Sequence, residues 1–160
     1  MIRALVMDVD GTLTDGKLHI GSNGEVYKSF NVKDGYAIHD MLPVMGIIPI
    51  IITGRKSKIV ECRCKELGIL HVVQGSKDKL SDLKTILLRE GIALEETAYI
   101  GDDLNDLICM NAVGLKGCPK DAAQEIQEIA DFVSQKDGGN GAVREFVEWI
   151  KGQDDDKERY

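Results

Sequence analysis

The sequence has no hydrophobic run long enough to cross a membrane. Its longest apolar run, Ile47–Ile52, has six residues and includes Pro49, whereas a membrane-spanning helix needs roughly 20 residues. The N-terminal segment Met1–Met7 meets Asp8 and Asp10 before an apolar signal region is complete. We therefore expect no membrane span and no secretion signal, and we predict a cytoplasmic protein.

Positive charge is also scarce. The 160 residues contain 20 lysines and arginines against 27 aspartates and glutamates, which gives a net charge of −7. This balance repels a phosphate backbone, and no cluster of basic residues offers it a binding face. We therefore expect no nucleic-acid partner.

Cysteine and histidine are few, and neither shows the spacing of a metal site. They are Cys62, Cys64, Cys109 and Cys118, with His19, His39 and His71. The cysteines form no C-x-x-C pair, and the histidines share no ligand spacing. We expect free thiols, which are the default in the cytoplasm, and we assign the histidines no role.

The sequence does contain a regular alternation of apolar, β-rich runs with amphipathic stretches. The runs are Ala4–Met7, Ile47–Ile52, Leu70–Val73, Ala98–Ile100, Val113–Leu115 and Asp131–Val133. This alternation predicts an α/β fold, a Rossmann-like parallel sheet flanked by helices, within a single domain over residues 1–152. Right-handed crossovers place the C-terminal ends of all strands at one edge of such a sheet, where ligands bind.

One segment, residues 17–30, departs from this alternation. Two short β-rich stretches flank Gly21–Gly24, which predicts a β-hairpin with an Asn-Gly turn. An isolated hairpin is marginal in water, so we expect it to pack on the domain or on another subunit.

Two further segments, one after the hairpin and one at the C-terminus, carry structural signals. After the hairpin, an acidic N-cap candidate and a glycine stop predict a helix from about Asp34 to Gly46. At the C-terminus, residues 154–159 are all charged, so we predict a disordered tail over residues 153–160.

The densest chemical signal follows the first strand. Asp8 and Asp10 are spaced i and i+2, so both carboxylates leave the strand end on the same side. Crowded carboxylates are costly unless a cation or a proton compensates them, and Gly11 permits a tight turn. The alternative is an ordinary Asp-Gly turn that leaves a strand.

The second strand end carries Thr53, Gly54 and Arg55. A hydroxyl, a glycine and a cation are groups that hold a phosphate oxygen at the start of a helix. The alternatives are that Thr53 is a helix N-cap and that Arg55 is a solvated residue of the first helical turn.

The third strand end is followed by Lys79. A lysine there can neutralise both a phosphoryl oxygen and a nucleophilic carboxylate, although most lysines are solvated surface charges. From the sequence, Lys77 competes with Lys79 for this position.

The fourth strand end carries Asp102, Asp103, Asn105 and Asp106. Three aspartates in five residues suit Mg²⁺, which prefers carboxylates and binds substrate phosphate. Part of this charge also fits the acidic N-terminus of a helix, where the dipole stabilises it.

With these four elements in chain order at four strand ends, the sequence resembles the haloacid dehalogenase superfamily of phosphotransferases. The resemblance implies that Asp8 is the nucleophile that becomes an aspartyl-phosphate and that Asp10 is the general acid and base. It also implies that Thr53 and Lys79 orient the phosphoryl group. The implied Mg²⁺ ligands are Asp8, Asp102 and the backbone carbonyl of Asp10.

The resemblance extends to the remaining residues of the four elements. Substrate-binding residues would be Gly54, Arg55 and Asn105, and the residues that support the metal ligands would be Asp103 and Asp106. An aspartate two residues after the nucleophile favours hydrolysis or transfer of a phosphate ester over dehalogenation.

Spacing places the chain in a narrower group of this superfamily. Asp8 lies 45 residues before Thr53, which lies 26 residues before Lys79, so neither gap can hold a cap domain. The segment with the predicted hairpin, residues 17–30, resembles the corresponding segment of the cap-less subgroup. Members of that subgroup hydrolyse phosphates of eight- and nine-carbon keto sugar acids. In that subgroup the hairpins join a homotetramer, and a neighbouring subunit contributes to the site.

This resemblance implies a Mg²⁺-dependent phosphatase for a deoxy-keto sugar acid phosphate, with 3-deoxy-D-manno-octulosonate 8-phosphate as the first choice. Arg55 can grip the carboxylate of a 2-keto acid through two hydrogen bonds. The sequence Thr53-Gly54-Arg55 also resembles that of octulosonate phosphatases, whereas nine-carbon relatives can carry Thr-Gly-Glu, so the resemblance favours the eight-carbon substrate. The segment Gly138–Glu145 also resembles the subgroup, but Asn140 stands where many relatives carry arginine. The alternatives are a phosphatase for sialic acid-type 9-phosphates and a non-catalytic oligomerisation module.

Overall fold

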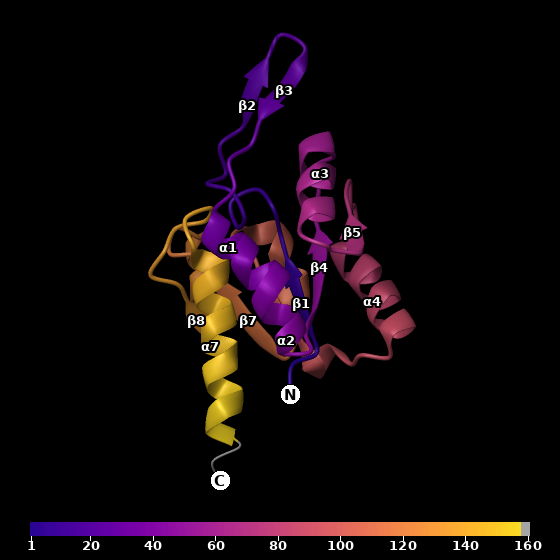
Figure 1. Ribbon diagram of the computed structural model, residues 1–160, viewed down its shortest axis with the longest axis vertical. Helices are drawn as coiled ribbons and strands as arrows, with labels where there is room; N and C mark the ends of the chain where they lie inside the picture. Colours follow the sequence, from indigo (N-terminus) through magenta and orange to yellow (C-terminus); the bar gives the residue numbers. More distant parts are fainter. Residues whose placement is uncertain (158–160) are drawn as a thin grey trace.

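A six-stranded sheet, in which every pair of neighbouring strands is parallel, forms the centre of the molecule (Figure 1). The computed structural model describes residues 1–157. The strands, in spatial order, are β5 (His71–Val73), β4 (Ile48–Ile52), β1 (Ala4–Met7), β6 (Thr97–Ile100), β7 (Leu115–Cys118) and β8 (Phe132–Val133). The predicted α/β fold is confirmed, with β1 at the point where the strand order changes direction.

Helices cover both faces of the sheet. They are α1 (Val32–Tyr36), η1 (Ala37–Met41), α2 (Leu42–Val44), α3 (Lys58–Glu66), α4 (Lys79–Glu90), α5 (Leu107–Met110), α6 (Gln124–Ile129) and α7 (Ala142–Lys157), with short 3₁₀ turns η2 (Leu94–Glu96) and η3 (Leu104–Asp106). The helices α1 to α3 and α7 pack on one face, and α4 to α6 pack on the other. Leu5 and Met7 of β1 enter the first core, and Ala4 and Val6 enter the second, which is why this strand is apolar throughout.

A two-stranded hairpin projects from the body between β1 and α1 (Figure 1). Its strands are β2 (His19–Gly21) and β3 (Gly24–Tyr27), within the predicted range. The turn differs from the expected Asn-Gly, because the two loop residues are Ser22 and Asn23. Gly24 instead pairs with Gly21 and closes the loop with a φ of +110°, a conformation that favours glycine.

The helix after the hairpin begins earlier than predicted. Asn31, not Asp34, is its N-cap, and its side chain accepts a hydrogen bond from the Lys33 backbone N–H. Asp34 lies inside the first turn, buried, where its Oδ1 accepts the backbone N–H of Arg144 at the start of α7 at 3.0 Å. The expected glycine stop is present, because Gly46 has a φ of +69°.

The strand β7 lies two residues later than the predicted Val113–Leu115. The backbone N–H of Gly114 donates to the carbonyls of Leu94 and Thr97, so the chain is still turning at this point. The strand continues through Lys116 to Cys118. The apolar run Val113–Leu115 therefore ends at the residue where β7 begins.

Residues 153–157, the described part of the tail predicted to be disordered over residues 153–160, are helical, so the prediction is wrong for these residues. The apolar face of α7, with Val143, Phe146 and Ile150 buried, starts a helix that continues to Lys157. Residues 158–160 lie outside the described residues. Asp155 and Asp156 are exposed, so their charges are compatible with a helix whose polar face remains in water.

The prediction of free thiols agrees with the structure of the described residues. All four cysteines are free, with Cys62 exposed and the others buried. No helix in residues 1–157 combines the length and the hydrophobicity of a membrane span.

Adding a methyl group beneath α7 tests the packing on the outer strands. In Gly117→Ala, the new Cβ would lie 2.7 Å from the buried ring of Phe146, which stacks on Phe132 and Trp149. We expect a loss of about 1–3 kcal/mol in the free energy of unfolding, measured by urea denaturation, because overpacking forces the ring to move.

The matched control for Gly117→Ala is Gly152→Ala on α7 itself. A Cβ at this exposed position meets no atom within 4 Å, so we expect an increase of up to about 1 kcal/mol from helix propensity. A stabilised Gly117→Ala protein would contradict the packing described for Phe146.

Candidate active site

Three strand ends bring the predicted site residues to one open cavity of about 160 Å³. Asp8 follows β1, Thr53 follows β4 and Asp102 follows β6, and β1 pairs with both of the other strands. The cavity is lined by Asp8, Asp10, Thr53, Gly54, Arg55, Asp102, Asp103 and Asn105. The parallel sheet therefore gathers residues that lie as much as 97 positions apart in the sequence.

Lys79, the first residue of α4, contacts the carboxylate of Asp8. Its Nζ is 3.3 Å from Oδ1 of Asp8 and 2.8 Å from Oδ1 of Asp106, and its side chain is only 6% exposed. Burial opposes the charge, but the two carboxylates outweigh it and raise the pKa of Lys79. Lys77 is exposed, so the structure places Lys79, not Lys77, at the predicted position.

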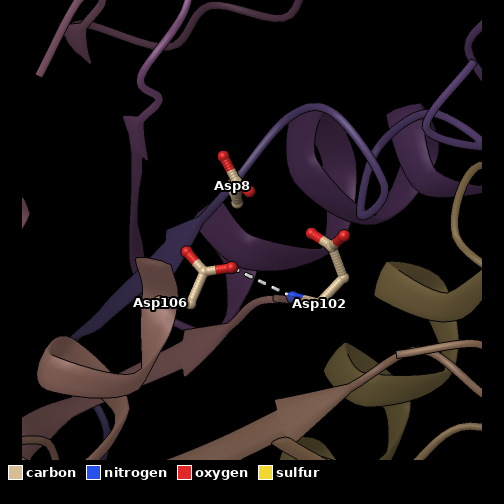
Figure 2. A group of neighbouring side chains, drawn as sticks. All are labelled: Asp8, Asp102 and Asp106. Atoms are coloured by element: carbon tan, nitrogen blue, oxygen red, sulfur yellow. Dashed lines mark hydrogen bonds between the residues drawn. The ribbon is translucent and has the colours of Figure 1, made fainter. Parts of the chain in front are cut away.

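Three carboxylates crowd together beside this lysine. One oxygen from each of Asp8, Asp102 and Asp106 can be chosen so that all three lie within 4.8 Å of one another (Figure 2). Burial, reinforced by the neighbouring carboxylates, raises the pKa of Asp8 to about 6 and that of Asp102 to about 8. These shifts indicate a local excess of negative charge, which a divalent cation would neutralise.

Asp106 is fully buried and its carboxylate is already occupied by hydrogen bonds. Its Oδ1 accepts from Lys79 at 2.8 Å and from the Tyr99 hydroxyl at 2.6 Å. Its Oδ2 accepts the backbone N–H groups of Asp102 at 3.0 Å (Figure 2) and Asp103 at 3.3 Å. Asp106 therefore orients Lys79 and the turn that carries Asp102, whereas Asp8 and Asp102 keep oxygens available for a metal ion.

The structure contradicts the alternative that Thr53 is the N-cap of a helix. Ser57 is the N-cap of α3, and its Oγ accepts the Val60 N–H at 3.2 Å. Thr53 is 3% exposed and lines the cavity. Arg55 is exposed on the same wall, where its guanidinium can meet a ligand.

A lysine and a glutamate from the hairpin complete the polar surroundings, and sequence reasoning missed both. Lys28 Nζ lies 2.6 Å from Oδ1 of Asp10 and 2.9 Å from Oε1 of Glu25. The other oxygen of Glu25 accepts the Ser57 hydroxyl at 2.5 Å. The only available signal was a pair of opposite charges three residues apart in the predicted hairpin, a pattern common on solvated surfaces.

Tight backbone packing fixes the loop that follows β1. A Cβ on Gly11 would lie 2.0 Å from Oδ2 of Asp102, and a Cβ on Gly138 would lie 1.9 Å from the carbonyl oxygen of Gly11. Only glycine allows these approaches. Asn140, in the same late loop, is exposed, and its amide donates to the carbonyl of Gly138 at 3.4 Å.

Removal and addition of Mg²⁺ test the carboxylate cluster. Because the pKa values of Asp8 and Asp102 exceed the ordinary 3.8, the metal-free folded state holds protons that the unfolded chain has released. These groups therefore destabilise the metal-free protein progressively as the pH rises from about 4 to about 8. We expect Mg²⁺ at about 100 times its Kd to raise the thermal midpoint by roughly 5–10 °C at about pH 8.

The increase in the thermal midpoint on addition of Mg²⁺ should be smaller at about pH 5.5, where protons compete with Mg²⁺ for the carboxylates. Differential scanning calorimetry with Mg²⁺ and with chelator measures both values. Asp102→Asn is the control, because it should lose most of the Mg²⁺ effect. An equal increase at both pH values would contradict the assignment of these carboxylates as ligands.

Comparison with known proteins gives the chain its family. Residues 52–146 match the model of the haloacid dehalogenase-like hydrolases. The 3-deoxy-D-manno-octulosonate 8-phosphate phosphatase of Salmonella typhi is 49% identical over 149 residues, which are 93% of this chain and 79% of the relative.

Two solved structures are similar over the same share of the chain. That of the corresponding phosphatase from Yersinia pestis has a TM-score of 0.89 and 44% identity, over 93% of this chain and 80% of its own. The phosphatase from Moraxella catarrhalis, in complex with a magnesium ion, a phosphate ion and a KDO molecule, has a TM-score of 0.88 and 44% identity, over 93% and 85%. With its strand-end carboxylates in place, the chain belongs to the haloacid dehalogenase-like hydrolase family.

Proposed function

We propose that this chain is a Mg²⁺-dependent phosphatase that hydrolyses a deoxy-keto sugar acid phosphate, with 3-deoxy-D-manno-octulosonate 8-phosphate as its preferred substrate. The observation that carries the proposal is the buried Asp8, which lies beside Lys79 and within the same carboxylate cluster as Asp102. The substrate is supported by 49% identity to a phosphatase named for that ester.

The first chemical step is phosphoryl transfer to Asp8. A carboxylate oxygen of Asp8 forms a bond to phosphorus while the bond from phosphorus to the sugar oxygen breaks. Asp10 gives a proton to the departing alkoxide, and Lys79 offsets negative charge beside the nucleophile. Asp8, Asp102 and the backbone carbonyl of Asp10 would hold Mg²⁺, which supplies further charge neutralisation when bound.

The second step releases inorganic phosphate. Asp10 is now a carboxylate, and it accepts a proton from a water molecule that attacks the phosphorus. The bond between phosphorus and Asp8 breaks, which restores both aspartates to their starting states. Thr53, buried at the end of β4, keeps the phosphoryl group oriented through both steps.

The exposed wall of the cavity supports the proposed substrate class. Arg55 can hold the carboxylate of a keto sugar acid through two hydrogen bonds, while Gly54 and Asn105 line the space beside it. The same wall can admit a nine-carbon sialic acid-type 9-phosphate, so this ester is the second candidate. A non-catalytic oligomerisation module has less support, because the chain retains Asp8, Asp10 and Lys79, on which the proposed reaction depends.

We also propose that the chain forms a homotetramer through its hairpin. Four apolar hairpin residues, Leu18, Ile20, Val26 and Tyr27, are between 43% and 61% exposed. The hairpin carrying them stands away from the body (Figure 1). Apolar surface gathered on a projecting element is typical of a subunit interface.

Phosphate release from a panel of sugar phosphates tests the proposed activity. With Mg²⁺, we expect the kcat/KM of the eight-carbon keto acid phosphate to exceed that of the other esters by about 100-fold, or about 2.7 kcal/mol of transition-state binding. A chelator should abolish the reaction. A preference for the nine-carbon ester would instead select the second candidate.

Substitution of the nucleophile provides the decisive variant of this experiment. Asp8→Asn should lower kcat by a factor of at least about 10³ on every ester. Asp40→Asn, on the exposed surface of η1, is the matched control and should leave kcat unchanged. Wild-type turnover by Asp8→Asn, or no turnover by the unsubstituted protein, would disprove the proposed function.

Charges placed on the hairpin test the tetramer. The double variant Ile20→Asp and Val26→Asp should shift the mass measured by light scattering from tetramer to monomer, because an interface cannot bury unpaired carboxylates cheaply. Leu88→Asp, at a residue of α4 that is 84% exposed, should remain tetrameric. A monomeric wild-type protein would contradict the proposal.

A further inference from the structure

Lys28 is a hairpin residue whose charged group lies at the active-site cavity rather than in solvent. Its side chain is only 2% exposed, although the hairpin as a whole projects from the body. The Nζ contacts Oδ1 of Asp10 at 2.6 Å and Oε1 of Glu25 at 2.9 Å. A lysine is rarely buried unless it is paired in this way.

The contact determines how Asp10 presents its carboxyl group. Among the described residues, the only side-chain hydrogen bond of Asp10 is the one that its Oδ1 accepts from Lys28. The Asp10 side chain is 19% exposed and lines the cavity. With Oδ1 anchored, Oδ2 remains for exchange of a proton with a bound molecule.

Glu25, the second carboxylate that Lys28 contacts, is attached to the body of the protein. Glu25 accepts the Ser57 hydroxyl at 2.5 Å, and the backbone N–H of Ser57 donates to Oε1 of Gln74 at 2.7 Å. The side-chain amide of Gln74 returns a hydrogen bond to the Ser57 carbonyl at 3.1 Å. The position of Lys28 is therefore fixed by the loops after β4 and β5, not by the hairpin alone.

The charge of Lys28 suits this arrangement. Burial opposes the ammonium charge, but hydrogen bonds with Asp10 and Glu25 outweigh it and raise the pKa of Lys28. The residue therefore remains a cation at neutral pH. A charged donor forms a stronger hydrogen bond with a carboxylate than a neutral donor does.

We propose that Lys28 is a positioning residue, which holds the Asp10 carboxyl group in the orientation needed to protonate the leaving oxygen of the substrate. This inference rests on the proposed phosphatase function. Without Lys28, the Asp10 side chain can adopt other rotamers, and a small misplacement of a catalytic group lowers the rate strongly. A merely structural lysine would instead affect all substrates equally.

Two esters with different leaving groups separate these roles. A sugar alkoxide needs a proton as it departs, whereas the p-nitrophenolate ion departs without one. In Lys28→Met, we expect kcat/KM to fall by at least about 30-fold on the sugar acid phosphate and by less than about 3-fold on p-nitrophenyl phosphate, since general acid catalysis contributes about 10² or more. Lys28→Gln should show the same selectivity, and Lys28→Arg should recover most of the loss.

The matched control is Lys17→Met, at an exposed lysine just before the hairpin, which should change neither rate constant. Thermal midpoints identify the folded variants, and either Lys28→Met or Lys28→Gln decides the question. If the unsubstituted protein hydrolyses neither ester, the proposed function fails and this inference fails with it. If the protein is active but the folded Lys28 variants lose both activities equally, or lose neither, only the role of Lys28 is overturned.

Discussion

The structure depends on how negative charge is compensated at the edge of the sheet. Asp8, Asp102 and Asp106 lie close together, with Asp8 and Asp106 buried and Asp102 half-buried. Lys79 is a buried cation that contacts Asp8 and Asp106. One ammonium group cannot balance three carboxylates. Burial, and after it the remaining repulsion between the carboxylates, raises the pKa values of Asp8 and Asp102. In the proposed function, the same imbalance that destabilises the metal-free edge provides the affinity for a divalent ion and, through it, for a phosphate ester.

Asp106 connects this edge to the hydrophobic core. Its four hydrogen bonds come from Tyr99 in β6, from Lys79 in α4 and from two backbone N–H groups of the turn after β6. Tyr99 is fully buried in the core that α4 to α6 cover. The position of Lys79, the cation beside the candidate nucleophile Asp8, is therefore set by core packing. Electrostatic catalysis requires such precise placement of charge.

The strands and the chemistry at their ends could be predicted from the sequence because both depend on local patterns. The runs at Ala4–Met7 and Ile47–Ile52 are apolar because these strands are buried on both faces, and parallel topology then brings Asp8 and Thr53 to one edge. The predicted strand Val113–Leu115 lies before β7 because the buried half of β7 includes Gly117, which has no apolar side chain to indicate in the sequence that it is buried. The helix start at Val32 was missed because Asp34 resembles an N-cap but forms its hydrogen bond with Arg144, 110 residues away.

Lys28 could not be predicted, and the reason bears on what the hairpin does. Its contact with Asp10 depends on where the end of the hairpin meets the loop after β1, which no local pattern records. The hairpin presents two kinds of surface, with Ile20 and Val26 exposed and with Glu25 and Lys28 bonded to the active-site loops. An element that served assembly alone would have no use for a buried ion pair at its base, where desolvation is costly. The contact of Lys28 with Asp10 therefore links the hairpin to the proposed general acid, so that an assembly formed through the apolar residues would also act on the orientation of Asp10.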